Sequence, residues 1–240
     1  MRRRFFVEQF SGDTTTIEGD AAHHLGRVLR AQPGQLYELS DGQQVRLGRI
    51  EKVARDRVDF TLLEQISAHQ PAIDVTLLLS IVKFDAFEWA IEKATELGVS
   101  TIIPLAAARS EKALLAAAGK RAERWKKLLA EASQQSRRVR MPILQSVFQP
   151  TQAFSAQPVG ATTVILSELP DAPTLRRILQ NEPAHRGAIL AVGPEGGWTE
   201  AELSAARTHN FREASLGKLI LRTETAVAAA LASINYALSE

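Results

Sequence analysis

The last third of the chain shows the clearest alternation between apolar stretches and polar breaks. Five consecutive apolar residues, Ala188–Val192, lead directly into the sequence Gly-Pro-Glu-Gly-Gly-Trp-Thr at positions 193–199. An apolar run of this length followed by glycine and proline predicts a buried strand that ends in a tight loop. Thr199 followed by Glu202 matches a capping box, so we expect a helix to begin directly after the loop.

A second loop of the same kind follows later in the chain. The residues at 215–217, Ser-Leu-Gly, predict a break, and Ile220-Leu221 is a short apolar run. Thr223 or Thr225 can then cap an alanine-rich helix that we expect over residues 226–238. Two glycine-bearing loops, each between a buried strand and a helix, are typical of a ligand pocket at the carboxyl edge of a parallel α/β sheet.

The middle of the chain predicts the rest of such a sheet. Val75–Val82 is nearly continuously apolar, as central parallel strands are. Asp85 with Glu88 matches the start of a helix, and Thr101–Leu105 predicts the next strand. Thr162–Glu168 predicts a further strand. The order strand, helix, strand indicates a parallel α/β unit.

The beginning of the chain follows a two-residue period instead. Apolar positions alternate from Val58 to Leu62, and Gln43–Val53 predicts the strand before them. Asp20 is expected to cap a short helix. The apolar side of that helix would carry Leu25, Val28 and Leu29. Several short strands and one short helix indicate a small β-barrel.

The boundary between the two patterns falls in the stretch 67–72, which has little apolar content and contains Pro71. We therefore expect a small β-barrel domain over residues 1–67, a linker over 68–73 and an α/β domain over 74–240.

Composition excludes several chemistries. With 240 residues, 45% hydrophobic and 23% charged, the chain is typical of a soluble protein. It has no cysteine, which excludes disulfides, thiolate zinc sites, iron–sulfur clusters and a cysteine nucleophile. The five histidines show no metal-ligand spacing, so no metal is expected.

No apolar run is long enough to span a membrane and the start lacks an apolar signal core, so the expected location is cytoplasmic without a membrane partner.

Charge is distributed unevenly. The net charge is +2, but the stretch 109–140 holds ten basic and three acidic side chains, a balance of +7. A local positive face fits a phosphate-backbone partner, and a solvated helix face fits this pattern equally well. Arginine binds phosphate bidentately. The best candidates for contacts to phosphate, at the start of the chain and in this stretch, are Arg2, Arg3, Arg4, Arg27, Arg30, Arg137, Arg138 and Arg140.

The loop sequences resemble a known family. Gly193-Pro-Glu-Gly-Gly, Leu216-Gly and the run Ile220–Ala226 look like the signature of the knotted SPOUT-class methyltransferases. More narrowly they resemble the ribosomal RNA small-subunit methyltransferase E family, which makes N3-methyluridine in 16S ribosomal RNA. Glu92–Val99 matches the same family, and the pattern around His24 to Gly42 resembles its PUA-like N-terminal domain.

The resemblance implies a fold, a cofactor and partners. It implies a PUA-like RNA-binding barrel, a SPOUT α/β domain with a trefoil knot, S-adenosylmethionine as cofactor, 16S ribosomal RNA or the small ribosomal subunit as partner, and a homodimer. No Gly-x-Gly-x-x-Gly occurs, so backbone groups of the knot loops would hold the cofactor. The expected cofactor-binding residues are Leu166, Glu168, Gly193, Glu195, Gly196, Gly197, Leu216, Gly217, Ile220, Leu221, Thr223 and Ala226.

Methylation of uridine N3 requires alignment, loss of the N3 proton and stabilisation of charge on the uracil. We expect Arg222 to stabilise charge on a uracil carbonyl oxygen and Glu224 or Glu195 to assist proton removal. Structural alternatives exist, because Glu195 could cap the following helix and Arg222 could pair with Glu224. The alternative functions are methylation of a ribose 2′-hydroxyl and non-catalytic RNA binding.

Overall fold

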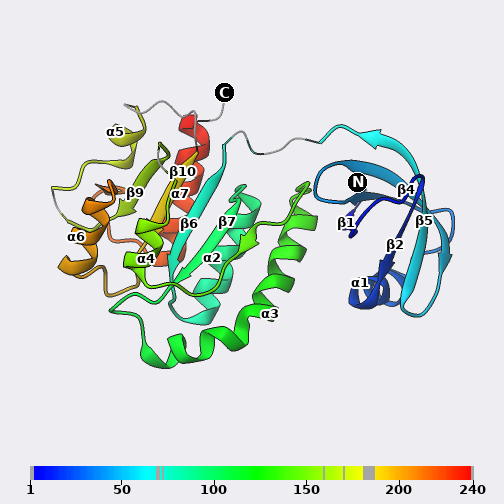
Figure 1. Cartoon of the computed structure of the whole chain (residues 1–240), viewed down its shortest axis with the longest axis horizontal. Helices are drawn as coiled ribbons and strands as arrows, with labels where there is room; N and C mark the ends of the chain where they lie inside the picture. Colours follow the sequence, from blue (N-terminus) through cyan, green and yellow to red (C-terminus); the bar gives the residue numbers. More distant parts are fainter. Residues whose placement is uncertain are drawn as a thin grey trace. The chain divides into compact units, whose positions relative to one another are not determined.

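The computed structural model describes residues 3–68, 71, 73–158, 160–169, 171–180 and 187–238. The chain divides into two compact units, which are described separately (Figure 1). The first unit comprises Met1–Gln70 together with Ser133–Met141, and the second comprises Pro71–Ala132 and Pro142–Glu240. The assignment of a segment from the middle of the chain to the first unit was not expected from the sequence. Arg2, which was predicted to bind RNA, lies outside the described residues.

The first unit is built on a five-stranded sheet with the order β1-β3-β4-β5-β2. Strand β1 is parallel to β3, and the other neighbours are antiparallel. Alternating apolar residues on the sheet, among them Leu39, Ile50 and Phe60, form its buried core. The elements are β1 Arg4–Phe6, β2 Thr14–Glu18, α1 Gly19–His23, β3 Leu36–Ser40, β4 Val45–Val53 and β5 Arg57–Ile66.

The short helical segment of this unit differs from the expectation. Helix α1 is followed by a π-helical turn, η1 His24–Val28, and the N-cap residue is Glu18 with no side-chain cap, so the assignment of Asp20 as the cap was wrong. Leu25 is buried, but Val28 is 63% exposed. A π-helical turn bonds residue i to i+5, and the α-helical spacing therefore does not keep these two residues on one side.

The second unit is a six-stranded, fully parallel sheet with the order β11-β9-β10-β6-β7-β8. The predicted strands from the apolar runs are confirmed. The strands are β6 Val75–Ser80, β7 Thr101–Leu105, β8 Ile143–Leu144, β9 Thr162–Leu166, β10 Ala188–Val192 and β11 Arg212–Ala214. The helices are α2 Phe84–Glu96, α3 Lys112–Gln135, α4 Pro150–Ser155, α5 Leu175–Gln180, α6 Glu200–Thr208 and α7 Thr223–Leu238.

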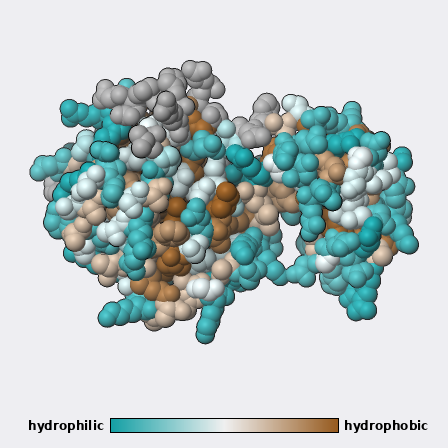
Figure 2. Space-filling view, in the orientation of Figure 1, coloured by the Kyte–Doolittle hydropathy of each residue, from teal (hydrophilic) through white to brown (hydrophobic). Residues whose placement is uncertain are grey.

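Helices cover both faces of this sheet (Figure 1). On one face, Leu77 and Leu79 of β6 pack in a cluster with residues of α2, α3, α5 and α7. On the other face, Leu78 packs with residues of α4 and α6. The alternation follows from the pleat of the strand. Hydrophilic residues cover most of the visible face of the first unit, whereas the visible face of the second is mixed, with hydrophobic residues near its middle (Figure 2).

Two of the three predicted helix starts in this unit differ from the structure. The capping box of Thr199 and Glu202 is confirmed. Helix α2 has Lys83 as its N-cap without a side-chain bond, so the proposed cap from Asp85 and Glu88 was wrong. Thr223 is the first residue of α7 rather than its cap, and its hydroxyl is bonded to another loop. No helix among the described residues has the length and apolar character needed to cross a membrane.

Candidate active site

The carboxyl ends of four parallel strands surround a cavity of about 1190 Å³ in the second unit. Most of its lining comes from the segments that follow β6, β9, β10 and β11 and from the start of α7, and Arg109 is contributed by the segment after β7. Strands β11, β9, β10 and β6 are consecutive neighbours in the sheet, so segments far apart in the sequence meet at one edge. This edge is where open parallel sheets bind ligands.

The loop after β10 is a tight turn whose shape depends on glycine. The Gly197 amide donates to the Pro194 carbonyl at 2.8 Å, and Gly197 has a φ of +70°. A side chain at this φ would be strained. A Cβ atom at Gly193 would lie 3.0 Å from the Trp198 ring, so the ring packs directly on the glycine backbone.

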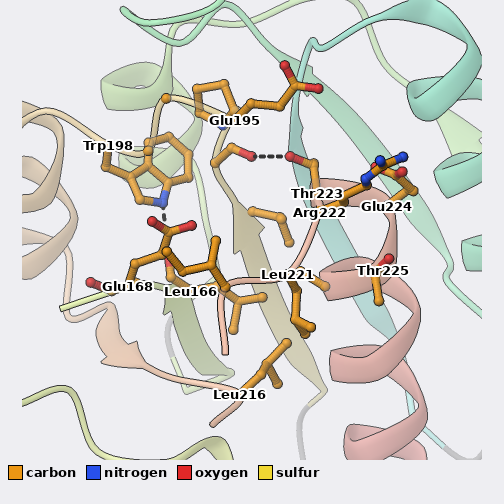
Figure 3. A pocket seen from close by; sticks show the side chains of 18 of the residues that line it. Leu166, Glu168, Glu195, Trp198, Leu216, Leu221, Arg222, Thr223, Glu224 and Thr225 are labelled. Carbon is orange, nitrogen blue, oxygen red and sulfur yellow. Dashed lines mark hydrogen bonds between the residues drawn. The ribbon is translucent and has the colours of Figure 1, made fainter. Parts of the chain in front are cut away.

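Hydrogen bonds connect this loop to the two neighbouring segments (Figure 3). The Trp198 Nε1 donates to the carbonyl of Leu166 at 3.0 Å, and the Thr223 hydroxyl donates to the carbonyl of Gly193 at 3.2 Å. The segments after β9 and β10 and the start of α7 are therefore joined into one frame around the cavity.

All the residues that the sequence assigned to the cofactor and to catalysis line this cavity, although their individual roles stay predictions. Leu166, Leu216 and Leu221 supply apolar side chains on one side (Figure 3). Several lining residues that come from distant segments were not predicted from the sequence. These are Lys83, Asp85, Trp89, Arg109 and Trp198. Only Trp198 had a sequence signal, since it lies within the glycine loop.

The charged candidates differ in their surroundings. Arg222 and Glu195 are exposed and Glu224 is half-buried. In the part of the chain that the structure describes, Arg222 makes no ion pair with Glu224. Glu195 does not cap α6, because Thr199 and Glu202 form that cap. Its side chain extends away from the apolar side chains of the cavity (Figure 3). These observations argue against a structural Arg222–Glu224 pair and against Glu195 as the cap of α6.

Several arginines that the sequence assigned to RNA are engaged inside the first unit. Arg4 is 4% exposed and forms an ion pair with Glu38 at 2.9 Å. It also donates to the carbonyl of Arg137, whose own guanidinium pairs with Glu38. The prediction that Arg4 contacts phosphate was wrong, because its guanidinium is buried and neutralised. Arg137 is a structural partner of the same carboxylate.

Arg138 requires a similar correction. It lies after the end of α3 and is 8% exposed, so it is not part of a solvent-facing helix surface. Burial, assisted by the neighbouring charge of Arg140, lowers the pKa of Arg138 to about 10. A group so removed from water is not a surface ligand for phosphate. Of the remaining candidates, Arg3, Arg27, Arg30 and Arg140 are exposed.

The described residues contain no cluster of three or more His, Cys, Asp or Glu that could hold a metal ion. The site therefore consists of backbone groups, apolar side chains and a few charged side chains at its rim.

Comparisons with known proteins agree with this arrangement. The RNA methyltransferase domain model matches residues 69–235, and the RNA methyltransferase PUA domain model matches residues 17–63. Ribosomal RNA small subunit methyltransferase E of Synechocystis sp. is 34% identical over 232 residues, which are 95% of this chain and 75% of the relative. The Bacillus subtilis enzyme of the same name is 32% identical, covering 98% of this chain and 96% of the relative.

Solved structures show the same fold. Ribosomal RNA small subunit methyltransferase E from Neisseria gonorrhoeae, bound to S-adenosylmethionine, has a TM-score of 0.88 at 30% identity over 98% of both chains. A protein from Legionella pneumophila in complex with the same cofactor has a TM-score of 0.88 at 26% identity, covering 99% of this chain and 98% of that one. The chain thus has the PUA-like and SPOUT-type α/β fold that was predicted, and it belongs to the ribosomal RNA small subunit methyltransferase E family.

Proposed function

We propose that this chain transfers a methyl group from S-adenosylmethionine to N3 of a uridine in 16S ribosomal RNA of the small ribosomal subunit. The observation that carries the proposal is the cavity at the carboxyl edge of the sheet, framed by glycine-rich backbone and bordered by the exposed Arg222. Two similar structures contain S-adenosylmethionine, and the relatives are named as small-subunit ribosomal RNA methyltransferases.

The lining fits the cofactor. Leu166, Leu216 and Leu221 offer apolar contacts to a planar base, and the glycines at 193, 196 and 197 let backbone approach a ligand closely. When bound there, S-adenosylmethionine supplies a methyl group that its sulfonium already activates. The protein therefore needs chiefly to align the acceptor and to stabilise charge.

Charged residues at the rim supply charge stabilisation and removal of the N3 proton. Arg222, without an ion-pair partner among the described residues, is available to stabilise negative charge on a uracil carbonyl oxygen. Glu224, two positions further at the start of α7, or Glu195 would accept the N3 proton. A guanidinium suits this role because it stays protonated and offers several donors.

Further features follow from the family. We propose that two chains pair as a homodimer, that the segments of the cavity form a trefoil knot, and that the protein acts in the cytoplasm. We retain 1–67, 68–73 and 74–240 as the extents of the RNA-binding domain, the linker and the methyltransferase domain. The match of the PUA domain model to residues 17–63 supports an RNA-binding first domain.

Nucleoside analysis tests the function directly. Purified protein, S-adenosylmethionine and either small subunits or 16S RNA lacking the modification are incubated, and the digested RNA is analysed by mass spectrometry. The expected product is N3-methyluridine. Gly197→Val provides a binding-deficient control, because a branched side chain is strained at a φ of +70°. A 2′-O-methylated nucleoside, or no product with either substrate, would reject the proposal.

A further inference from the structure

Arg109 contacts the cofactor loop from a distant part of the sequence. It lies in the segment between β7 and α3, and its Nη1 donates to the carbonyl of Gly196 at 2.8 Å and to that of Trp198 at 3.1 Å. Its side chain also packs on the loop, since a Cβ atom at Gly196 would lie 3.3 Å from the Arg109 Cβ. One side chain thus holds two peptide groups of the glycine-rich turn.

A second side chain, that of Glu202 in α6, also connects the end of the glycine-rich loop to the segment that carries Arg109. Glu202 accepts a hydrogen bond from the Ala108 amide at 2.9 Å with one carboxylate oxygen, and its other oxygen accepts the Thr199 amide at 2.8 Å. Ser110 in turn donates to the carbonyl of Ile81 at 2.7 Å, which anchors the segment at the end of β6. Because both chain neighbours of Arg109 are hydrogen-bonded, the backbone from which its side chain extends is held in place.

The bonds of the loop leave a specific set of groups for a ligand. The carbonyls of Gly193, Pro194, Gly196 and Trp198 all accept hydrogen bonds from within the protein. Within the described ranges, the amides of Glu195 and Gly196 have no protein partner. Donors that line a cavity without a partner are suited to acceptor atoms of a ligand.

The need for Arg109 follows from the composition of the loop. Two adjacent glycines, Gly196 and Gly197, give the free chain wide conformational freedom, and ordering it on binding would weaken affinity. A guanidinium that fixes two carbonyls removes much of this freedom before the ligand arrives. We propose that Arg109 is a positioning residue that preorganises the 193–198 loop for S-adenosylmethionine. The inference rests on the proposed function for the identity of the ligand.

The test compares three variants by calorimetric titration with S-adenosylmethionine. Arg109→Met keeps a carbon stem over Gly196 but removes the donors, and Arg109→Lys restores one shorter donor. Arg207→Met is the matched control, because Arg207 pairs with Glu200 and Glu213 and does not line the cavity. We expect the Kd to rise about 10- to 100-fold in Arg109→Met, to recover partly in Arg109→Lys and to stay unchanged in Arg207→Met.

Kinetics separates positioning from other roles. In Arg109→Met the KM for S-adenosylmethionine should rise with the Kd, while kcat at saturation and the KM for RNA stay within about threefold. A lower Tm with an unchanged Kd would overturn the inference in favour of a purely structural role. A raised KM for RNA alone would overturn it in favour of a phosphate ligand. Failure of the wild-type protein to bind S-adenosylmethionine would instead reject the proposed function itself.

Discussion

Two groups of arginines in this protein, one from each unit, occupy opposite environments. In the first unit, Arg4 and Arg137 converge on the carboxylate of Glu38, where Arg4 is 4% exposed. In the second unit, Arg222 is exposed at the rim of the cavity and has no ion-pair partner in the described ranges. Arg4 and Arg137 stabilise the fold of the first unit, whereas Arg222 remains available to bind a ligand.

The difference shows that a basic residue can serve either the fold or a ligand, and that its burial and its partners decide which. Arg4 was assigned to phosphate contacts because arginine binds phosphate bidentately, but a buried carboxylate neutralises it. Removing one member of a buried ion pair leaves an uncompensated charge, whereas removing an exposed charge costs the fold little. Substitution should therefore affect stability at the Glu38 network and chemistry at Arg222.

The largest expected effect is that of Glu38→Gln. Loss of the carboxylate leaves Arg4 and Arg137 without their shared counter-charge, and we expect the first unit to lose about 3–5 kcal/mol of unfolding free energy. Hydrogen exchange measured by mass spectrometry should show faster exchange of amides in β3 and β4, with little change in β6 and β10.

Glu51→Gln is the matched control in the same sheet. Its partner is Arg49 at 3.0 Å, and both side chains are nearly half exposed. Exchange in this variant should stay close to that of the wild type. If both variants behave alike, burial is not what distinguishes the Glu38 network.

The next largest effect concerns Arg222→Ala. If Arg222 stabilises charge that develops on the uracil, turnover should fall by roughly two to three powers of ten, as loss of an oxyanion donor does. Affinity for S-adenosylmethionine should change by less than about threefold, because backbone and apolar groups supply most of that site. Lysine should restore only part of the rate, since it lacks the planar fork of donors.

Glu224→Gln shows whether the two residues work as a structural pair. A pair that merely holds the start of α7 predicts that both substitutions lower Tm and cofactor affinity together. Retained turnover at saturating cofactor in an Arg222→Ala protein that melts early would end the catalytic assignment.

The sequence predicted the parts of the fold that depend on local patterns. Apolar runs such as Val75–Val82 and Ala188–Val192 mark buried parallel strands, and the Thr199–Glu202 capping box is a local motif, so all three were identified correctly. Strand β11, with the sequence Arg-Glu-Ala, was missed because three residues with a single apolar side chain carry no periodic signal.

The features that sequence reasoning missed depend on contacts between distant residues. Arg109 reaches a loop 87 positions away, and Arg137 meets a carboxylate 99 positions away. Glu88 was assigned to a cap, but it is bonded to α3 instead. Motif resemblance located the cavity, since its glycine loops are contiguous in sequence, while the side chains that support those loops are not.

The salt dependence of RNA binding tests whether exposed arginines of the first unit, unlike Arg4 and Arg137, are available to a ligand. Arg3, Arg27 and Arg30 are exposed in the first unit. Their simultaneous replacement by alanine should make the fall of log affinity with log salt less steep, by roughly 2–3 units of slope. Arg57→Ala is the control, because Arg57 is also exposed but is paired with Glu18 and Asp59. An unchanged slope in the triple variant would mean that these arginines are merely solvated.

The smallest effect should come from Glu88, which resembles Glu38 in having two arginine partners but differs in their exposure. The Glu88 side chain is 8% exposed, while those of Arg121 and Arg124 are 40% and 62% exposed. Hydrogen bonding from Arg124 lowers the pKa of Glu88 below 4.5, against the opposing effect of burial. A carboxylate whose pKa is lower in the folded protein contributes stability above its unfolded pKa and loses it as pH falls through the folded value.

The wild-type protein should therefore melt about 2–4 °C above Glu88→Gln at pH 7, and the gap should narrow as the pH is lowered below about 4.5. Because water screens both arginines, this difference should be smaller than the one produced by Glu38→Gln. Thermal melts of the two variants and the wild type at a series of pH values check the order. A gap for Glu88→Gln that widens on acidification would contradict the direction of the pKa shift. A gap larger than that of Glu38→Gln would contradict the view that partner exposure decides how much a shared carboxylate stabilises the fold.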